Sequence, residues 1–352
     1  MYLHFVIDSV YIEKFISFVT KHFPDQKHVF VAVKRSNVKY VSSNRLHVFN
    51  SPISSELRRL VSKSDKIFVH SLFNTWVIVW LLMNRKLLKK TYCFLWGGDV
   101  YSYWLQDKHS INSIMVERLK STFMRKIRKV IMEFREDYEF VQSKYNINTD
   151  YYEAFYPAPV DFETLDNVPN KSAHNNTIRI MVGNSASDSN RHFEILEALW
   201  KNQIVRSAHD IEIMCPLSYG DMEYARKVIE YGKSKFGERF KPLTELLPPE
   251  EYAKVLASVD VAVFDHKRQQ AFSNILALLY LGKKVYVRSD VTTWQFLRRI
   301  GVTVADTNDI LANEKEDLFL FNRDLADANR EKIYTQFSEE RCVQLWSNLF
   351  AE

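Results

Sequence analysis

The 352-residue sequence predicts an α/β fold made of two doubly wound parallel-sheet domains in tandem. Runs that are apolar throughout alternate with helical patterns in both halves of the chain, which is typical of strands covered on both faces of a parallel sheet. Residues 157–176 interrupt this alternation with three prolines and four asparagines. The same alternation then restarts, so the sequence indicates two domains joined by a polar linker.

The expected elements follow one another in strand–helix order. In the first half we expect strands at 3–8, 28–33, 45–49, 66–71, 91–96 and 129–134, and helices near 10–22, 54–63, 74–88, 112–128 and 136–144. In the second half we expect strands at 178–183, 211–216, 260–265, 284–289 and 302–306, and helices at 189–202, 221–236, 249–259, 273–282, 292–300 and 329–350. The domains are therefore predicted as 1–160, a linker at 161–176, 177–330, and a C-terminal helical segment at 331–352 that packs back on the first domain.

Composition excludes several classes of protein. Cys93, Cys215 and Cys342 are odd in number and far apart, which fits buried residues in a reducing compartment and neither a disulfide framework nor a metal site. No stretch approaches the roughly 20 apolar residues of a membrane span. The first residues predict a strand and not a signal peptide.

Positive charge is concentrated in residues 118–129, which hold six basic residues and no acidic one. These are Arg118, Lys120, Arg125, Lys126, Arg128 and Lys129. Apolar residues lie between them, as in helices that rest on anionic lipid or bind nucleic acid. A solvated helix face explains the same pattern.

Polar residues that follow strands are the best candidates for a site, because ligands of parallel sheets bind outside the carboxyl ends of the strands. In the second half these residues are Gly183, Asn184, Ser185, Tyr219, Arg268, Gln269, Gln270 and Asn274. The glycine loop predicts phosphate binding at a helix start. The arginine and the amides suit a diphosphate and sugar hydroxyl groups. Ordinary turns and helix caps are the alternatives.

The first half offers candidates for catalysis and for a second substrate. His70 and Asp99 each follow an apolar strand, and either side chain could act as general base on a hydroxyl nucleophile. Asn74, Tyr101 and Trp104 are candidate contacts for a sugar. A hydrogen-bonded structural histidine and a capping aspartate are the alternatives. No HExxH pattern or cluster of histidine and cysteine predicts a metal.

Five blocks in order, FVHSLFN, LWGGDVY, YPAPVD, MVGNSASDSN and FDHKRQQ, span about residues 66 to 275. On these blocks the chain resembles glycosyltransferase family 56, the dTDP-N-acetylfucosamine:lipid II N-acetylfucosaminyltransferases (4-alpha-L-fucosyltransferases). The resemblance implies a GT-B fold with two Rossmann-like domains and an interdomain cleft. It also implies a peripheral protein on the cytoplasmic face of the bacterial inner membrane.

The activity implied by this resemblance is transfer of a 4-acetamido-4,6-dideoxyhexose from a dTDP-sugar to a polyprenyl-diphosphate-linked saccharide. The pathway would be that of enterobacterial common antigen or O-antigen, with no metal and no cofactor. The resemblance places the donor on the eight second-half candidates. It places the acceptor or catalysis on His70, Asn74 and Asp99, and it favours a membrane surface for the basic segment 118–129. A nucleotide-sugar epimerase of the same fold and a non-enzymatic sugar-binding protein remain alternatives.

Overall fold

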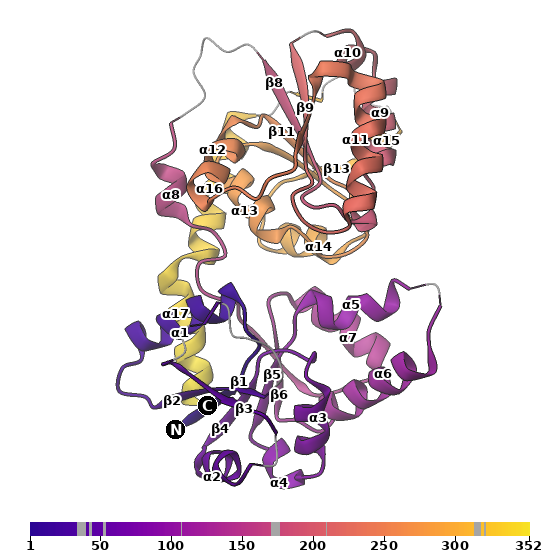
Figure 1. Ribbon diagram of the computed structural model, residues 1–352. Coiled ribbons are helices and arrows are strands. Elements are labelled where there is room, and N and C mark those ends of the chain that lie inside the picture. Colours follow the sequence, from indigo (N-terminus) through magenta and orange to yellow (C-terminus); the bar gives the residue numbers. More distant parts are fainter. Residues whose placement is uncertain are drawn as a thin grey trace. The chain divides into compact units, whose positions relative to one another are not determined.

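The structure is a computed structural model that describes residues 1–33, 40–41, 44–51, 54–106, 108–169, 177–208, 210–312, 318–319 and 322–352. The chain forms two compact units. The first unit is Met1–Ala158 together with Glu339–Glu352, and the second is Pro159–Ser338. Each unit is an α/β body built on a parallel sheet (Figure 1), as the sequence predicts.

In the described residues the sheet of the first unit has seven parallel strands in the order β3-β2-β1-β4-β5-β6-β7. The strands are β1 (Tyr2–Phe5), β2 (His28–Val33), β3 (Leu46–Phe49), β4 (Lys66–Val69), β5 (Thr91–Phe94), β6 (Lys129–Met132) and β7 (Asp150–Glu153). The chain builds outward from β1 in one direction and then from β4 in the other. The loops after these two strands therefore diverge and leave a crevice at the carboxyl edge.

Helices cover both faces of this sheet (Figure 1). They are α1 (Val10–His22), α2 (Ser55–Lys63), α3 (Thr75–Leu82), α4 (Arg85–Leu88), α5 (Gly97–Trp104), α6 (Ile111–Met124), α7 (Arg135–Tyr145) and α17 (Glu339–Ala351). The core lies between these layers. Leu3, Val31, Ile67, Cys93 and Val130 have no exposed surface, because strands buried on both faces carry apolar side chains throughout.

The last helix, α17, belongs to the first unit, where it lies beside α1 (Figure 1). Trp346 is fully buried and its indole N–H donates to the carbonyl oxygen of Phe155 at 3.0 Å. The Tyr2 hydroxyl donates to the carbonyl oxygen of Phe350 at 2.9 Å. One helix was expected over 329–350. The structure instead has two helices, with the first ending at Phe337.

The second sheet has six parallel strands in the described residues, in the order β10-β9-β8-β11-β12-β13. They are β8 (Ile178–Val182), β9 (Ile211–Pro216), β10 (Phe240–Leu243), β11 (Val261–Phe264), β12 (Lys284–Val287) and β13 (Ala305–Asp306). The direction of building reverses between β8 and β11. The crevice of this sheet therefore lies between the loops after those two strands.

The helices of the second unit complete the same architecture. They are α8 (Phe162–Asp166), α9 (His192–Lys201), α10 (Gln203–Ser207), α11 (Met222–Phe236), α12 (Pro249–Ser258), α13 (Phe272–Tyr280), α14 (Thr292–Arg299), α15 (Thr307–Leu311) and α16 (Arg323–Phe337), with short 3-10 turns at Asp188–Asn190 and Gly237–Arg239. The predicted linker 161–176 is partly helical. Its helix α8 is tied to the second unit by an ion pair from Arg330 to Asp166 at 2.5 Å. Residues 170–176 lie outside the described residues.

Candidate functional site

The crevice of the second sheet brings together side chains from three separate loops. Asn184 and Ser185 follow β8, Tyr219 follows β9, and Gln270 precedes α13. The Asn184 amide donates to the Tyr219 hydroxyl at 2.7 Å. The Gln270 amide donates to the Asn184 oxygen at 3.2 Å and to the Ser185 hydroxyl at 3.3 Å. Four of the eight predicted donor residues therefore form one hydrogen-bonded group, which we call the amide cluster.

Asn190 holds the loop after β8 in place. Its side-chain oxygen accepts from the backbone N–H of Asn184 at 2.8 Å and pairs with Nε2 of His266 at 2.9 Å. Burial lowers the pKa of His266 to about 3 and that of His192 to about 4, so both rings are neutral at neutral pH. The sequence alone did not predict these supporting residues. Asn190 lies eight positions beyond β8, and only the fold brings it back to Asn184.

Gly183 leaves room for the side chains that hold the loop after β8. Its φ is +69°, and a Cβ there would lie 2.5 Å from Nε2 of His192 and 2.7 Å from the side-chain oxygen of Asn190. We expected this glycine to let the backbone turn tightly in a loop that holds a phosphate. The structure shows instead that the space beside it is filled by the side chains that support the loop, so a glycine is required whether or not a ligand binds.

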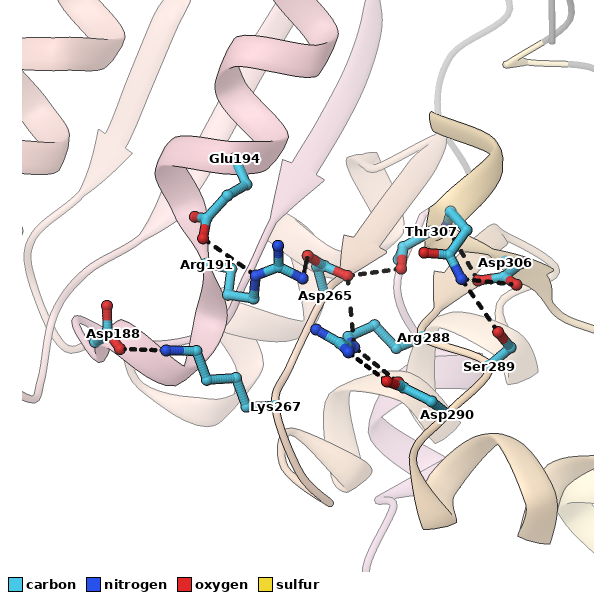
Figure 2. A network of polar contacts seen from close by, with 11 residues as sticks. Asp188, Arg191, Glu194, Asp265, Lys267, Arg288, Ser289, Asp290, Asp306 and Thr307 are labelled. Carbon is cyan, nitrogen blue, oxygen red and sulfur yellow. Dashed lines mark hydrogen bonds and ion pairs between the residues drawn. The ribbon is translucent and has the colours of Figure 1, made fainter. Parts of the chain in front are cut away.

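A network of charges surrounds Asp265 at the carboxyl edge of the same sheet (Figure 2). Asp265 is fully buried just after β11 and lies between the guanidinium groups of Arg191 and Arg288, at 2.9 and 4.0 Å. The Thr307 hydroxyl donates to Asp265 at 2.7 Å. Burial raises the pKa of Asp265, and the two guanidinium groups oppose that shift. The network places two arginines, each with about a fifth of its side chain exposed, at the carboxyl edge of the sheet.

The remaining donor candidates lie around α13. Arg268 is half-buried, and its guanidinium donates to the carbonyl oxygen of Gln269 at 2.6 Å. The Asn274 amide donates to the hydroxyl of Tyr252 at 3.0 Å. Ala271 precedes the helix with a left-handed φ of +57°, and no side chain caps the first turn of α13. The N–H groups of that turn thus lie beside Gln270, where an anion is favoured.

The structure gives Asp99 the capping partners that were the alternative to a catalytic base. The side chain is fully buried, and its two oxygens accept from the backbone N–H groups of Leu72 and Trp96, both at 2.7 Å. Burial raises the pKa of Asp99 to about 7, although those two hydrogen bonds favour the carboxylate. Gly97 and Gly98 form no turn with positive φ but begin helix α5. Asp99 is therefore a helix cap that also anchors the loop after β4.

His70, Asn74 and Tyr101 also have structural partners. His70 is buried, with Nδ1 2.6 Å from the Tyr156 hydroxyl and Nε2 2.9 Å from Nδ1 of His4. Burial lowers the pKa of His70 to about 3. Asn74 caps α3, and Tyr101 is buried with its hydroxyl donating to Asp137 at 2.5 Å. Asn74 is half-buried, and Trp104 is the most open of the predicted first-unit candidates, with 38% of its surface exposed.

The six basic residues do not form one open face. Lys120 is buried and donates to Glu117 at 2.6 Å. Lys129 is buried and pairs with Glu352 at 2.7 Å, while Arg128 pairs with Asp150 at 3.3 Å. Arg125 donates to backbone carbonyl groups. Of these six residues, Arg118, Arg125 and Lys126 are exposed and form no ion pair with a described residue.

The structure reveals other exposed groups at or near the carboxyl edge of the first sheet. Tyr11 at the start of α1 and Phe73 after β4 are about half exposed, and Trp76 at the start of α3 is 70% exposed. Glu133 follows β6 directly and is half-buried. Glu133 was not among the predicted site residues because the strand was expected to extend to residue 134. The rule that favours residues after strands would have identified it with the strand end at Met132.

In the described part of the chain, no three His, Cys, Asp or Glu side chains are grouped so that they could hold a metal ion. The independence from metals and cofactors stays a prediction. None of the described helices is long and apolar enough to cross a membrane.

Comparison with known proteins connects this fold to an enzyme family. Residues 10–352 match the family described as 4-alpha-L-fucosyltransferase glycosyl transferase group 56. Sucrose-phosphate synthase from Thermosynechococcus elongatus has a similar structure, with 13% identity, a TM-score of 0.69 and 99% of each chain covered.

Two further solved structures show the same likeness. HepE from Anabaena, solved in complex with UDP and glucose, is 12% identical, with a TM-score of 0.68 over 100% of this chain and 99% of that one. A glycosyltransferase from Rickettsia africae is 14% identical, with a TM-score of 0.65 over 99% and 97%. At these identities the likeness shows the fold, which is GT-B.

Proposed function

Because the chain belongs to the 4-alpha-L-fucosyltransferase family, glycosyltransferase group 56, we propose that it moves a 4-acetamido-4,6-dideoxyhexose from dTDP to a polyprenyl-diphosphate-linked saccharide. The product would serve bacterial surface polysaccharide synthesis, either enterobacterial common antigen or O-antigen. The enzyme class, a glycosyltransferase, follows from the family itself. To this class we add the identity of the donor and of the acceptor, and the part of the chain that binds each.

The amide cluster is the observation that supports the donor site. Its members converge on the crevice between β8 and β11, where parallel sheets bind ligands. Amides and hydroxyl groups at fixed distances suit the hydroxyl groups of a ribose or a sugar. Tyr219 is half exposed and offers a ring for the thymine base or the sugar.

The diphosphate is assigned to the basic side of the same crevice. Arg268 and the uncapped first turn of α13 supply positive charge, and Arg191 and Arg288 lie close by in the network around Asp265. Such fixed groups stabilise the charge that develops on a leaving diphosphate. This chemistry needs no metal, so we expect transfer to continue in the presence of EDTA.

The lipid-linked acceptor and the membrane are assigned to the first unit. Helices α3 and α6 pack against each other. Trp76 in α3, Met83 directly after α3, and Ile111 and Met115 in α6 are each more than 55% exposed. We call these four residues the apolar patch. Exposed Arg85, Lys86 and Arg118 flank it in sequence. Apolar side chains with basic neighbours are typical of a surface that rests on anionic lipid, here the cytoplasmic face of the inner membrane.

A thermal-shift experiment tests the donor assignment. Ligand that binds the folded protein raises its melting temperature, and we expect dTDP to do so more than UDP or GDP at the same concentration. Replacement Arg268→Ala should weaken dTDP about tenfold, the typical value of one charged hydrogen bond. The control Arg298→Ala removes an exposed arginine at the far end of α14 and should leave dTDP binding unchanged. Equal dTDP binding by wild type and Arg268→Ala would contradict the assignment.

A further inference from the structure

Glu133 occupies a distinctive position in the first unit. It is the first residue after β6, a strand that pairs with both β5 and β7 inside the sheet. Its carboxyl group therefore lies at the carboxyl edge, the side on which ligands of parallel sheets bind. It interacts electrostatically with Tyr11 at the start of α1, with Tyr156 after β7 and with Asp137 in α7.

The carboxyl group of Glu133 has no hydrogen bond or ion pair to any residue that the structure describes. Other acids at this edge do have partners. Asp99 accepts from two backbone N–H groups, Asp137 accepts from the Tyr101 hydroxyl, and Asp8 accepts from the backbone N–H groups of Tyr40 and Val41. Because it is half-buried and unpaired with any described residue, this carboxyl group is available to a bound ligand.

The surroundings of Glu133 shift the pKa of its carboxyl group into the range that general-base catalysis needs. Burial, reinforced by the Asp137 carboxylate, raises the pKa of Glu133 to about 8. A general base is most effective when its pKa lies near the working pH. Tyr11 and Tyr156 have pKa values raised by burial, so both stay protonated where Glu133 titrates.

Aromatic rings border this carboxyl group. Tyr11 is 49% exposed and meets the half-buried Trp96 edge-on, with ring centroids 5.2 Å apart. Trp96 in turn lies 5.0 Å from the ring of Tyr156. Flat, partly exposed rings beside one polar group are a suitable surface for a sugar ring.

We propose that Glu133 is the general base of transfer, and that it accepts the proton of the acceptor saccharide's hydroxyl group. This inference rests on the proposed function. As the hydroxyl oxygen forms its bond to the anomeric carbon of the donor sugar, its O–H bond breaks and the proton moves to the Glu133 carboxylate. The bond from the anomeric carbon to the diphosphate oxygen breaks at the same time, and the nucleoside diphosphate leaves with the electron pair.

The test compares wild type with Glu133→Gln, Glu133→Asp and the control Glu139→Gln, which changes an exposed carboxyl group of α7. Each protein is assayed for transfer from dTDP-sugar to a lipid-linked acceptor, and for the melting-temperature shift caused by dTDP. We expect Glu133→Gln to lower kcat by about 100-fold or more, with an unchanged dTDP shift. Glu133→Asp should recover part of that loss, and Glu139→Gln should match wild type.

A pH profile separates catalysis from a structural role. Wild-type kcat should rise with pH to a plateau above about pH 8, and Glu133→Gln should lose that rise. If wild type transfers sugar and Glu133→Gln keeps its rate and its pH profile, the assignment of Glu133 is wrong while the proposed function stands. If wild type binds dTDP but transfers no sugar, the proposed function fails and the assignment fails with it.

Discussion

The loop after β8 needs a glycine at position 183. The variant Gly183→Ala tests whether the backbone conformation alone or also the crowding by neighbouring side chains is the reason. Placing a residue with a Cβ at φ +69° lowers the free energy of unfolding by about 1–2 kcal/mol. The new Cβ would also lie within 2.7 Å of His192 and Asn190, so at least one of them must move. Asn190 would then lose its hydrogen bond from the Asn184 N–H or from His266, and each loss leaves a buried polar group unsatisfied at about 1–3 kcal/mol. The expected total is about 2–5 kcal/mol.

A matched glycine separates the two contributions. Gly282 has a similar φ of +71°, but a Cβ there would meet only the Cβ of Ala326 at 3.5 Å, an ordinary contact. Gly282→Ala should therefore lower the free energy of unfolding only by the contribution of the left-handed backbone, about 1–2 kcal/mol. Urea unfolding of both variants measures the difference, and dTDP titration measures the donor site. We expect Gly183→Ala to be the less stable variant and to bind dTDP at least tenfold more weakly. Equal stability and equal dTDP affinity of the two variants would refute this account of the loop.

Three further predictions concern the two units separately. Asp99→Asn should lower the free energy of unfolding in urea by about 1–3 kcal/mol, because the single oxygen of the new amide cannot accept from both the Leu72 and Trp96 N–H groups. Binding of dTDP should not change. A variant as stable as wild type would contradict the capping role. Burial lowers the pKa of His266 to about 3 from the ordinary 6.5, so the unfolded chain takes up the proton first and the stability contributed by this group is lost as the pH falls below 6.5. At pH 5 this effect lowers the free energy of unfolding by about 2 kcal/mol. The variant His266→Gln should therefore lose less stability than wild type between pH 7 and pH 5. Equal losses in the two proteins would contradict the prediction. Replacing Trp76 and Ile111 by serine should reduce flotation with anionic vesicles but not the melting temperature, because both side chains are mostly exposed, and unchanged flotation would exclude the apolar patch as the membrane surface.

The sequence predicts the fold well because the information is local. Strands buried on both faces are apolar along their whole length, and their alternation with helices is visible without knowledge of the contacts. The two strands that escaped prediction, β7 (DYYE) and β10 (FKPL), lie at sheet edges and are only partly buried. Edge strands of this kind lack the apolar pattern, and Pro242 in β10 is tolerated only at such an edge.

The site was less accessible to prediction because burial and pairing depend on residues far away in the chain. Asp99 gains its partner Leu72 from another loop, and Lys129 pairs with Glu352 at the other end of the sequence. Neither contact leaves a local signal. Glu133 was lost for a simpler reason, since an error of two residues at a strand end hides the position that the post-strand rule would select.

Every assignment above depends on sugar transfer from dTDP, which product analysis measures. The protein is incubated with a dTDP-4-acetamido-4,6-dideoxyhexose and a polyprenyl-diphosphate-linked saccharide, and both products are measured by mass spectrometry. We expect each acceptor molecule to gain one sugar residue while an equal amount of dTDP is released. An epimerised nucleotide sugar without dTDP release, or a bound sugar with no turnover, would contradict it.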